Sequence, residues 1–89
     1  MTFLRYSLLV RTDCEREFIL LGYRMRLSRS EASLLCRLTE GTVDTDGLGL
    51  KMRRTTAAFV CSVNKKAFRI SGRRLILFRD GGYRLNPYL

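Results

Sequence analysis

The sequence predicts a small α+β domain in which antiparallel hairpins flank a helical middle. Three stretches carry this prediction: "LILFRDGGYRL" (75–85) alternates around an Asp-Gly pair, "SRSE" (28–31) matches a helix capping box, and 53–69 has apolar residues at helical spacing. With 89 residues the chain has the size of one domain, so we treat 1–89 as a single unit.

The first 27 residues predict a strand and then a hairpin. We expect a short strand over 6–11, a turn over 12–15 and a hairpin over 18–27. In that hairpin an apolar run over 18–21 is followed by Gly22 and then by strict alternation of basic and apolar residues. One face of the hairpin is therefore expected to be apolar.

A helix is predicted over about 29–40. Ser28 and Glu31 have the spacing of a capping box, in which each side chain accepts a hydrogen bond from the backbone N–H of the other residue. The apolar residues behind this box recur at helical spacing (Leu34, Leu35 and Leu38). Gly41 provides a stop.

The stretch 42–52 leaves two alternatives open. Val43, Leu48 and Leu50 fit one face of a short helix, with Asp44 or Thr45 as its cap. The two glycines of "DGLGL" would each cost about 1 kcal/mol relative to Ala inside a helix. The stretch is therefore either one irregular helical turn or a loop.

The next helix is predicted within 53–69, with Thr55 or Thr56 as its N-cap. Its inward stripe contains Phe59, Val60, Val63 and Ala67. The predicted opposite side contains Ala58, Ser62, Lys65, Lys66 and Arg69. This helix is expected to have an apolar back and a front that is small at its start and cationic at its end.

The chain ends in a predicted hairpin with Asp80-Gly81 as a two-residue type I′ loop. A loop at Gly81-Gly82 is disfavoured because it would set Arg79 opposite Arg84, a like-charge pair. The preferred register gathers Ile76, Phe78, Tyr83 and Leu85 on one surface, which we expect to dock on the core. The other surface has cations at its tip.

Charge is distributed unevenly along the chain. Residues 1–50 contain seven arginines and seven acids, whereas residues 51–89 contain ten basic residues and one acid, so the whole surplus of +9 lies in the second part. This asymmetry favours a polyanionic partner, most often nucleic acid, over an anionic membrane surface or an acidic protein. Of the 17 cations 14 are arginines, whose guanidinium can contact phosphate or guanine in a bidentate manner.

Other classes of protein are disfavoured by composition. There is no His and no CxxC, and Cys14, Cys36 and Cys61 are odd in number, so we expect no metal site, no cofactor and no disulfide framework. Without His, general bases are few, and Asp44 and Asp46 fit cap and turn positions, so no catalytic residue is predicted. No apolar run has the length of a membrane span or a signal peptide, and the expected location is the cytoplasm, without membrane association.

A basic amphipathic helix followed at once by a basic hairpin is the arrangement that a winged helix-turn-helix requires. On this interpretation the helix over about 55–68 enters the major groove of double-stranded DNA and the hairpin 75–85 lies on the backbone or in the minor groove. The candidate DNA-binding residues are Ser62, Asn64, Lys65, Lys66 and Arg69 for the major groove, Arg53, Arg54, Thr55 and Thr56 for phosphates, and Arg79 for the hairpin contact.

Two stretches also resemble a known family. "FILLGYRMRLSRSEASLLCRL" (18–38) looks like the first half of the OmpR/PhoB-type winged-helix effector domains of bacterial response regulators, and "LILFRDGGYRL" looks like their closing wing, with Asp80 in place of a Gly. "VCSVNKKA" is similar to their recognition helix, with Asn64 where an Arg is common. The resemblance implies an N-terminal antiparallel sheet, about three helices, a wing and a role as a DNA-binding transcriptional regulator.

The chain also departs from that family. The stretch between its first helix and its recognition helix is shorter than usual, so the second helix and the loop with which relatives touch RNA polymerase are expected to be reduced or missing. We expect no receiver domain within these 89 residues, which would be either an excised effector domain or a small stand-alone regulator. RNA polymerase and a second copy of the chain on tandem DNA half-sites remain further partners that the resemblance allows.

The alternative function is a winged-helix module that binds a protein or RNA without sequence-specific DNA binding. Recognition of single-stranded RNA usually relies on exposed aromatic side chains. The register above assigns Phe78 and Tyr83 to the buried surface, which favours DNA. Exposure of these rings would favour RNA.

Overall fold

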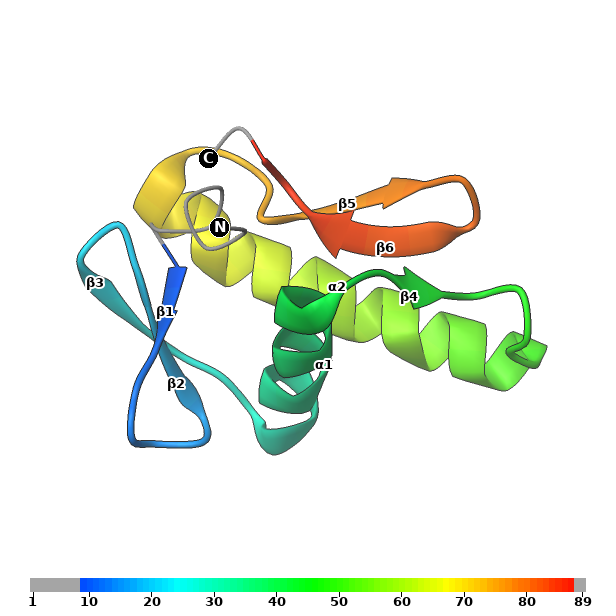
Figure 1. Cartoon of the computed structure of the whole chain (residues 1–89), viewed down its shortest axis with the longest axis horizontal. Coiled ribbons are helices and arrows are strands. Elements are labelled where there is room, and N and C mark those ends of the chain that lie inside the picture. Colours follow the sequence, from blue (N-terminus) through cyan, green and yellow to red (C-terminus); the bar gives the residue numbers. More distant parts are fainter. Residues whose placement is uncertain (1–8, 88–89) are drawn as a thin grey trace.

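The computed structural model describes residues 9–87 and begins with a three-stranded antiparallel sheet (Figure 1). Its strands are β1 (Leu9–Arg11), β2 (Glu17–Leu20) and β3 (Tyr23–Arg26), in the order β1-β2-β3. The predicted turn over 12–15 joins β1 to β2, and the part of the predicted first strand before residue 9 lies outside the described residues. Leu21 and Gly22, both at positive φ, form the tight turn between β2 and β3.

One face of this sheet is apolar, as predicted. Phe18 and Leu20 of β2 and Met25 of β3 are buried, whereas Arg24 and Arg26 are exposed. The alternation of the sequence thus sets which face packs on the core.

Helix α1 (Arg29–Glu40) has the predicted bounds. The Glu31 backbone N–H donates to Ser28 Oγ at 3.2 Å, and the Ser28 N–H donates to Glu31 Oε1 at 2.7 Å, so the capping box is complete. Gly41 ends the helix as predicted, in an extended rather than a left-handed conformation (φ 163°).

The open stretch 42–52 contains no helix of its own. It divides into strand β4 (Val43–Asp44), a turn, and the first residues of α2 (Leu50–Ser71). Thr45 fixes the turn by donating its N–H (2.9 Å) and its hydroxyl (2.7 Å) to the Gly81 carbonyl. The prediction of three helices is therefore wrong for the described residues, which hold two.

Helix α2 begins earlier than predicted. Its N-cap is Gly49, which has no side chain to form a cap bond, so Thr55 and Thr56 lie inside the helix and neither of them caps it. The Thr55 hydroxyl donates instead to the Lys51 carbonyl at 2.9 Å. The residues 51–54 (KMRR) are all good helix formers, which explains the earlier start. Gly72, in the left-handed conformation, ends α2.

The C-terminal hairpin has the predicted loop and register. Strands β5 (Ile76–Arg79) and β6 (Gly82–Leu85) pair Ile76 with Leu85 and Phe78 with Tyr83, and the loop residues have φ 52° and 76°. Strand β4 pairs with β6, which makes a second sheet in the order β4-β6-β5.

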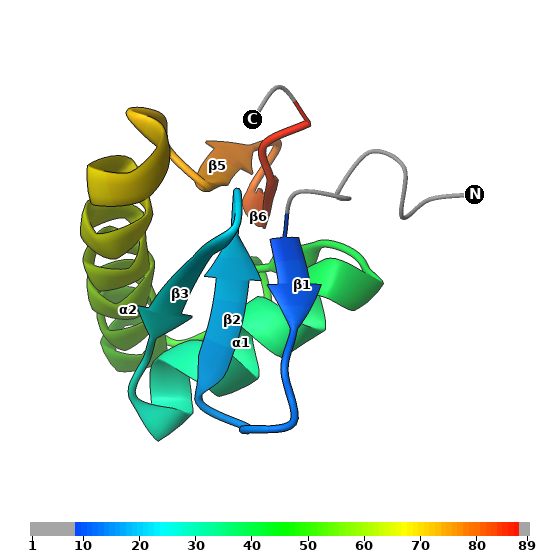
Figure 2. The ribbon, with the colours of Figure 1, turned by 90° about the vertical axis from the view of Figure 1, so that its left-hand side faces the viewer.

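Helix α2 is the longest element, and the other elements pack along it (Figures 1 and 2). The first sheet contacts its C-terminal part, α1 crosses it, and β5 runs beside it in the opposite direction. The core lies between these layers and includes Leu35, Val63, Leu75 and Leu85, each at most 1% exposed. The N-terminal third of α2 projects beyond α1, and no residue of α2 before Val60 is buried.

Candidate nucleic-acid interface

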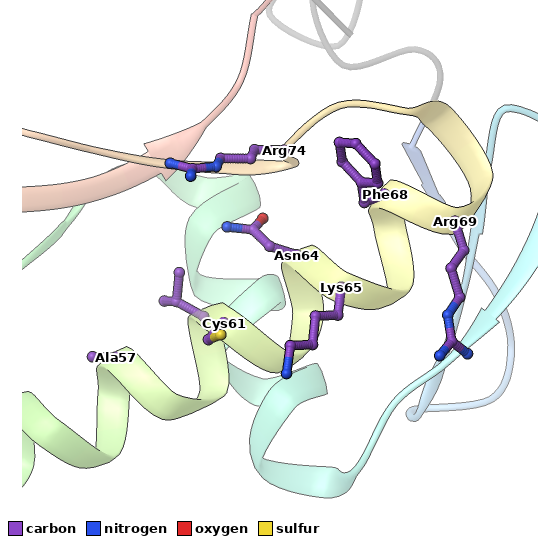
Figure 3. A pocket seen from close by; sticks show the side chains of 8 residues that line it. Ala57, Cys61, Asn64, Lys65, Phe68, Arg69 and Arg74 are labelled. Carbon is purple, nitrogen blue, oxygen red and sulfur yellow. The ribbon is translucent and has the colours of Figure 1, made fainter.

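A trough runs between α2 and β5, and it consists of two depressions. The first has a volume of about 580 Å³ and is lined by Ala57, Val60, Cys61, Asn64, Lys65, Phe68, Arg69 and Arg74 (Figure 3). The second has a volume of about 290 Å³ and is lined by Thr45, Arg53, Arg54, Ala57, Phe78 and Tyr83. Ala57 lines both, so the two depressions adjoin there; we call them together the α2–β5 trough.

The trough is strongly basic. Lys65, Arg69 and Arg74 line the first depression and Arg53 and Arg54 line the second, whereas no described residue that lines either depression is acidic. In Figure 3, Arg74 lies on the hairpin side of α2, and Lys65 and Arg69 extend away from the hairpin. Cations that gather on a surface lined by no acid create a positive potential that attracts polyanions.

The exposed side of α2 next to the trough is narrow. Exposed residues follow each other at helical spacing (Arg54, Ala58, Cys61, Lys65 and Arg69), and we call this set the outer face. Its middle residues are small and cations stand at both ends. The outer face differs from the predicted face in that Ser62 and Lys66 do not belong to it. Both of these residues contact Glu31 of α1.

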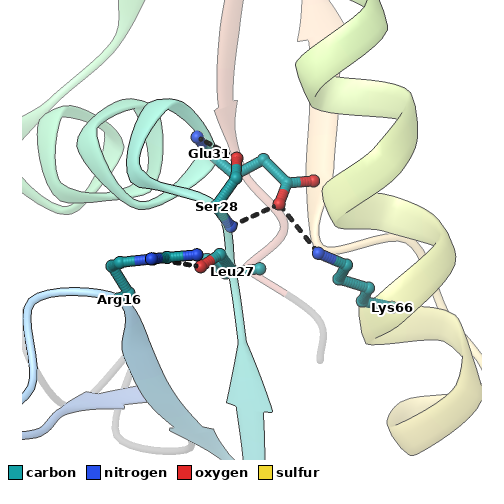
Figure 4. A network of polar contacts seen from close by, with 5 residues as sticks. All are labelled: Arg16, Leu27, Ser28, Glu31 and Lys66. Atoms are coloured by element: carbon teal, nitrogen blue, oxygen red, sulfur yellow. Dashed lines mark hydrogen bonds and ion pairs between the residues drawn. The ribbon is translucent and has the colours of Figure 1, made fainter.

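Lys66 was predicted to contact DNA, and in the structure its ammonium pairs with Glu31 while 39% of its side chain stays exposed. Its Nζ donates to Glu31 Oε1 at 2.8 Å, and the side chain of Glu31 is only 4% exposed (Figure 4). Beside this pair, Arg16 Nε donates to the Leu27 carbonyl at 3.1 Å and ties the first sheet to the start of α1. A buried carboxylate needs a cation, and Lys66 is the one within reach.

The hydrogen bonds of this network lower the pKa of Glu31. Burial by itself would raise the pKa, but hydrogen bonds from the Lys66 ammonium, the Ser28 backbone and the Ser62 hydroxyl outweigh burial and lower it from 4.5 to about 2. Ser62, another predicted DNA contact, therefore also serves the contact between α1 and α2.

Asn64 was predicted to read adenine, and the structure uses its amide to hold β5. Asn64 Nδ2 donates to the Ile76 carbonyl at 3.1 Å, while the Ile76 N–H donates to Asn64 Oδ1 at 2.8 Å. The side chain thus pairs with the outer edge of β5 in the way a neighbouring strand would. Each polar atom of the Asn64 amide makes one hydrogen bond to Ile76, so reading a base would compete with the contact to β5.

The predicted phosphate contacts separate into anchored and exposed residues. Arg53 Nε donates to the carbonyls of Thr45 and Leu48, both at 3.1 Å, and closes the turn before α2. Thr55 and Thr56 are half-buried, and Thr55 bonds to its own helix. Arg54 is exposed over the second depression.

Arg79, predicted to make the hairpin contact, is exposed at the end of β5 and does not lie beside Lys65 and Arg69. Because β5 runs opposite to α2, Arg74 accompanies the C-terminal half of α2, and Phe78, the neighbour of Arg79, lines the depression with Arg54. Figure 1 agrees, since the loop of the hairpin and the start of α2 lie at the same end of the molecule. Of the predicted cations, Arg53, Arg54, Lys65 and Arg69 are therefore spread along the trough, and Arg79 and Lys66 line neither depression.

The trough residues outside the predicted set include Arg74, Phe68 and Phe78. Arg74 lies between the predicted helix and the predicted hairpin, Phe68 was assigned to neither face of its helix, and Phe78 was assigned to the buried surface of the hairpin. Phe78 is 57% exposed, so that assignment is wrong, although its strand partner Tyr83 is 9% exposed, as predicted. Phe78 is exposed because this part of the hairpin extends past the buried core. The alternation of the strand does not show how far along the hairpin the core reaches. The sequence did contain a signal that Phe68 is exposed. It lies three residues after Lys65 and next to Arg69, both of which were assigned to the exposed side of the helix.

No protein-family model, curated protein or solved structure matches this chain. Within residues 9–87 no helix is long and apolar enough to cross a membrane, and no group of three or more Cys, Asp or Glu residues is placed to hold a metal ion. Cys14 and Cys61 are exposed free thiols, and Cys36 is half-buried.

Proposed function

We propose that this protein binds double-stranded DNA and acts as a transcriptional regulator, with the outer face of α2 in the major groove and the β5–β6 hairpin against the backbone or minor groove. The observation that carries this proposal is the surplus of positive charge that lines α2 and the trough beside it. Residues 51–89 hold the whole surplus of +9, and the described residues that line the trough include five cations and no acid.

The shape of the outer face supports this role. A helix with its side chains is about 10–12 Å across, close to the roughly 12 Å width of the major groove, so a helix enters deeply only where its side chains are small. Ala58 and Cys61 make the middle of the outer face slim. Arg54 and Arg69, at a rise of about 1.5 Å per residue, are roughly 22 Å apart along the axis and can reach phosphates at the two ends of the contact. Lys65 lies between them, within reach of base edges.

The order of the elements also supports a winged-helix arrangement. Helix α1, the short strand β4, helix α2 and the β5–β6 hairpin follow one another, and the hairpin is tied to β4 and packs beside α2. This order agrees with the resemblance to OmpR/PhoB-type effector domains, except that β4 and a turn replace a separate helix between α1 and α2.

A duplex-binding titration tests the proposal. Fluorescence anisotropy with a pool of random-sequence duplexes, at several NaCl concentrations, is expected to show an affinity that falls steeply with salt. The triple variant Arg54→Ala, Lys65→Ala, Arg69→Ala should bind on the order of 100-fold more weakly and reduce the log–log salt slope by about two to three. Selection of bound duplexes from the same pool would then define the preferred sequence.

The matched control removes the same charge elsewhere. Arg11, Arg24 and Arg37 are exposed on β1, β3 and α1, and their triple alanine variant is expected to keep most of the affinity and the salt slope. Equal losses for both triple variants would mean that net charge, and not the outer face, governs binding. An affinity that does not depend on salt would refute the proposal.

A further inference from the structure

We propose that the α2–β5 trough also binds an unpaired nucleic-acid strand, with bases stacked on Phe68 and Phe78. This inference goes beyond duplex binding because it uses the floor of the trough and its aromatic rings rather than the slim outer face. It shares with the proposed function the cations Arg54, Lys65 and Arg69, which belong to the outer face and also line the trough.

The first observation is the exposure of two phenylalanines in one trough. Phe68 and Phe78 are each 57% exposed, although a phenylalanine is among the residues most often found inside a protein. Phe68 lines the first depression and Phe78 lines the second. Each ring therefore presents apolar surface inside a concave site and not on a flat face.

The second observation is that Phe78 is held in place by Tyr83. The two ring centroids are 5.0 Å apart with an interplanar angle of 60°, an edge-to-face contact, and Tyr83 itself is 9% exposed. Strand pairing between Phe78 and Tyr83 fixes the backbone of both residues. A ring that is already ordered loses little side-chain entropy when a base stacks on it.

The third observation is that each ring has cations beside it. Arg74 and Lys65 line the depression of Phe68, and Arg54 lines the depression of Phe78. Single strands are bound by this combination, because every base has a flat π-surface that stacks on an aromatic ring while the phosphates contact cations. Paired bases inside a duplex are already stacked and do not offer these surfaces.

The trough is also long enough for several nucleotides. From Ala57, where the depressions join, to Phe68 the helix rises by roughly 17 Å, at about 1.5 Å per residue. The methyl group of Ala57 is the smallest side chain that lines the trough, so a strand can continue from one depression into the other. Phe78, on β5, lines the second depression, which begins at Ala57.

The test compares a single strand with a duplex. Labelled 12-nucleotide oligodeoxythymidine and a labelled blunt duplex of the same length are titrated with wild-type protein and with the double variant Phe68→Leu, Phe78→Leu, at one salt concentration. Leucine keeps an apolar side chain and removes the ring. We expect the double variant to lose on the order of 10-fold or more in affinity for the single strand. Its affinity for the duplex should stay within about threefold.

Tyr23→Leu is the control for loss of an exposed ring. Tyr23 is 65% exposed on β3, in the other sheet, and its replacement should change neither affinity. Thermal unfolding of each variant checks that it folds; if the double variant is destabilised, Phe68→Leu alone, which leaves the contact between Phe78 and Tyr83 intact, is used, with an expected loss of several-fold.

The possible outcomes separate this inference from the proposed function. Ring-dependent binding of the single strand without duplex binding would support the inference and refute the proposed function. Duplex binding together with a double variant that binds the single strand as well as wild type does would refute the inference alone. Equal losses for both ligands would assign the rings to the duplex site and overturn the inference. A wild-type protein that binds neither ligand would overturn both proposals and leave a protein partner for the trough.

Discussion

Glu31 shows how one residue can serve two elements of this fold. Its backbone N–H and carboxylate complete the capping box with Ser28, and the same carboxylate accepts the Lys66 ammonium of α2. Because it is 3% exposed, the charge is stable only as long as these donors are present. The residue therefore couples the start of α1 to the middle of α2.

The lowered pKa of Glu31 predicts acid sensitivity. A carboxyl whose pKa is about 2 in the folded protein and 4.5 ordinarily contributes stability above pH 4.5, and this contribution is lost as the pH falls from 4.5 through 2. The size of the shift corresponds to about 3 kcal/mol. Urea unfolding between pH 2 and pH 7 should show this loss for wild type and a flatter profile for Glu31→Gln. Glu40→Gln, an exposed change on the same helix, should keep the wild-type profile, and parallel profiles for all three proteins would contradict the prediction.

Asn64 is expected to matter for folding rather than for base recognition. Asn64→Ala removes both hydrogen bonds to Ile76 and should lower the free energy of unfolding by about 2 kcal/mol, measured by urea unfolding without nucleic acid. Lys65→Ala, at the exposed position beside it, should change stability by less than about 0.5 kcal/mol. An Asn64→Ala protein with wild-type stability and weakened duplex binding would instead restore the base-reading role.

At the scale of the elements, the clearest contrast is between the two helix starts. The capping box predicts the start of α1 to the residue, because the side chains that form the cap are neighbours in sequence. Helix α2 starts at an N-cap glycine with no side-chain bond, and Arg53 closes the preceding turn through contacts that depend on the folded turn. For this reason the N-cap pattern at Thr55 and Thr56 predicted a start of α2 that is several residues too late.

The C-terminal hairpin was predicted in register because its loop is also a local feature. Asp80 and Gly81 both have positive φ, which the type I′ loop requires. What the pattern did not show is the contact of this loop with the turn before α2, where the Gly81 carbonyl accepts two hydrogen bonds from Thr45. The hairpin is held to the body by its loop as well as by its apolar side.

Gly81→Ala tests this attachment. Gly81 has φ 76°, and an added Cβ would lie 2.9 Å from Asp46 Oδ1, so the substitution should cost about 1–2 kcal/mol in the free energy of unfolding, measured by urea unfolding. Gly47→Ala is the matched control in the neighbouring turn, because a Cβ there meets no atom within 4 Å. Similar stabilities for the two variants would show that the loop tolerates a side chain and that the attachment is weaker than inferred.

At the scale of the whole molecule, the dominant feature is the uneven distribution of charge between the two parts of the chain. Residues 1–50 carry balanced charges, whereas residues 51–89, which include α2 and the hairpin, carry the surplus. Cations on one side of a small domain repel each other when they lie within the screening length, about 10 Å at 0.1 M salt. The repulsion between the cations of this basic surface therefore lowers the free energy of unfolding.

This repulsion predicts that salt stabilises the free protein. Raising NaCl from 50 mM to 0.5 M should increase the midpoint of thermal unfolding by about 3–6 °C, equivalent to roughly 0.5–1 kcal/mol. The triple variant Arg54→Ala, Lys65→Ala, Arg69→Ala should show a smaller increase. A decrease of the midpoint with salt would indicate that attractive ion pairs, such as the one between Lys66 and Glu31, outweigh the repulsion.

The features that could be read directly from the sequence are local in origin. The capping box at Ser28 and Glu31, the alternation along β2 and β3 and the Asp80-Gly81 loop each depend on residues a few positions apart, so their outcome is the same in many surroundings. The surplus of positive charge in 51–89 is likewise a property of composition. These features predicted the α+β class, α1 and the two hairpins.

The folded chain decided which side of α2 is available. Helical spacing predicts that Val60, Val63 and Ala67 face inward, and they are buried, but spacing does not tell which neighbours stand beside that stripe. Lys66 and Ser62 form hydrogen bonds with Glu31, and Asn64 forms hydrogen bonds with β5. Phe78 is exposed because the hairpin extends past the buried core. Contacts between residues 12 to 35 positions apart depend on how whole elements pack, and a one-dimensional pattern holds no information about that packing.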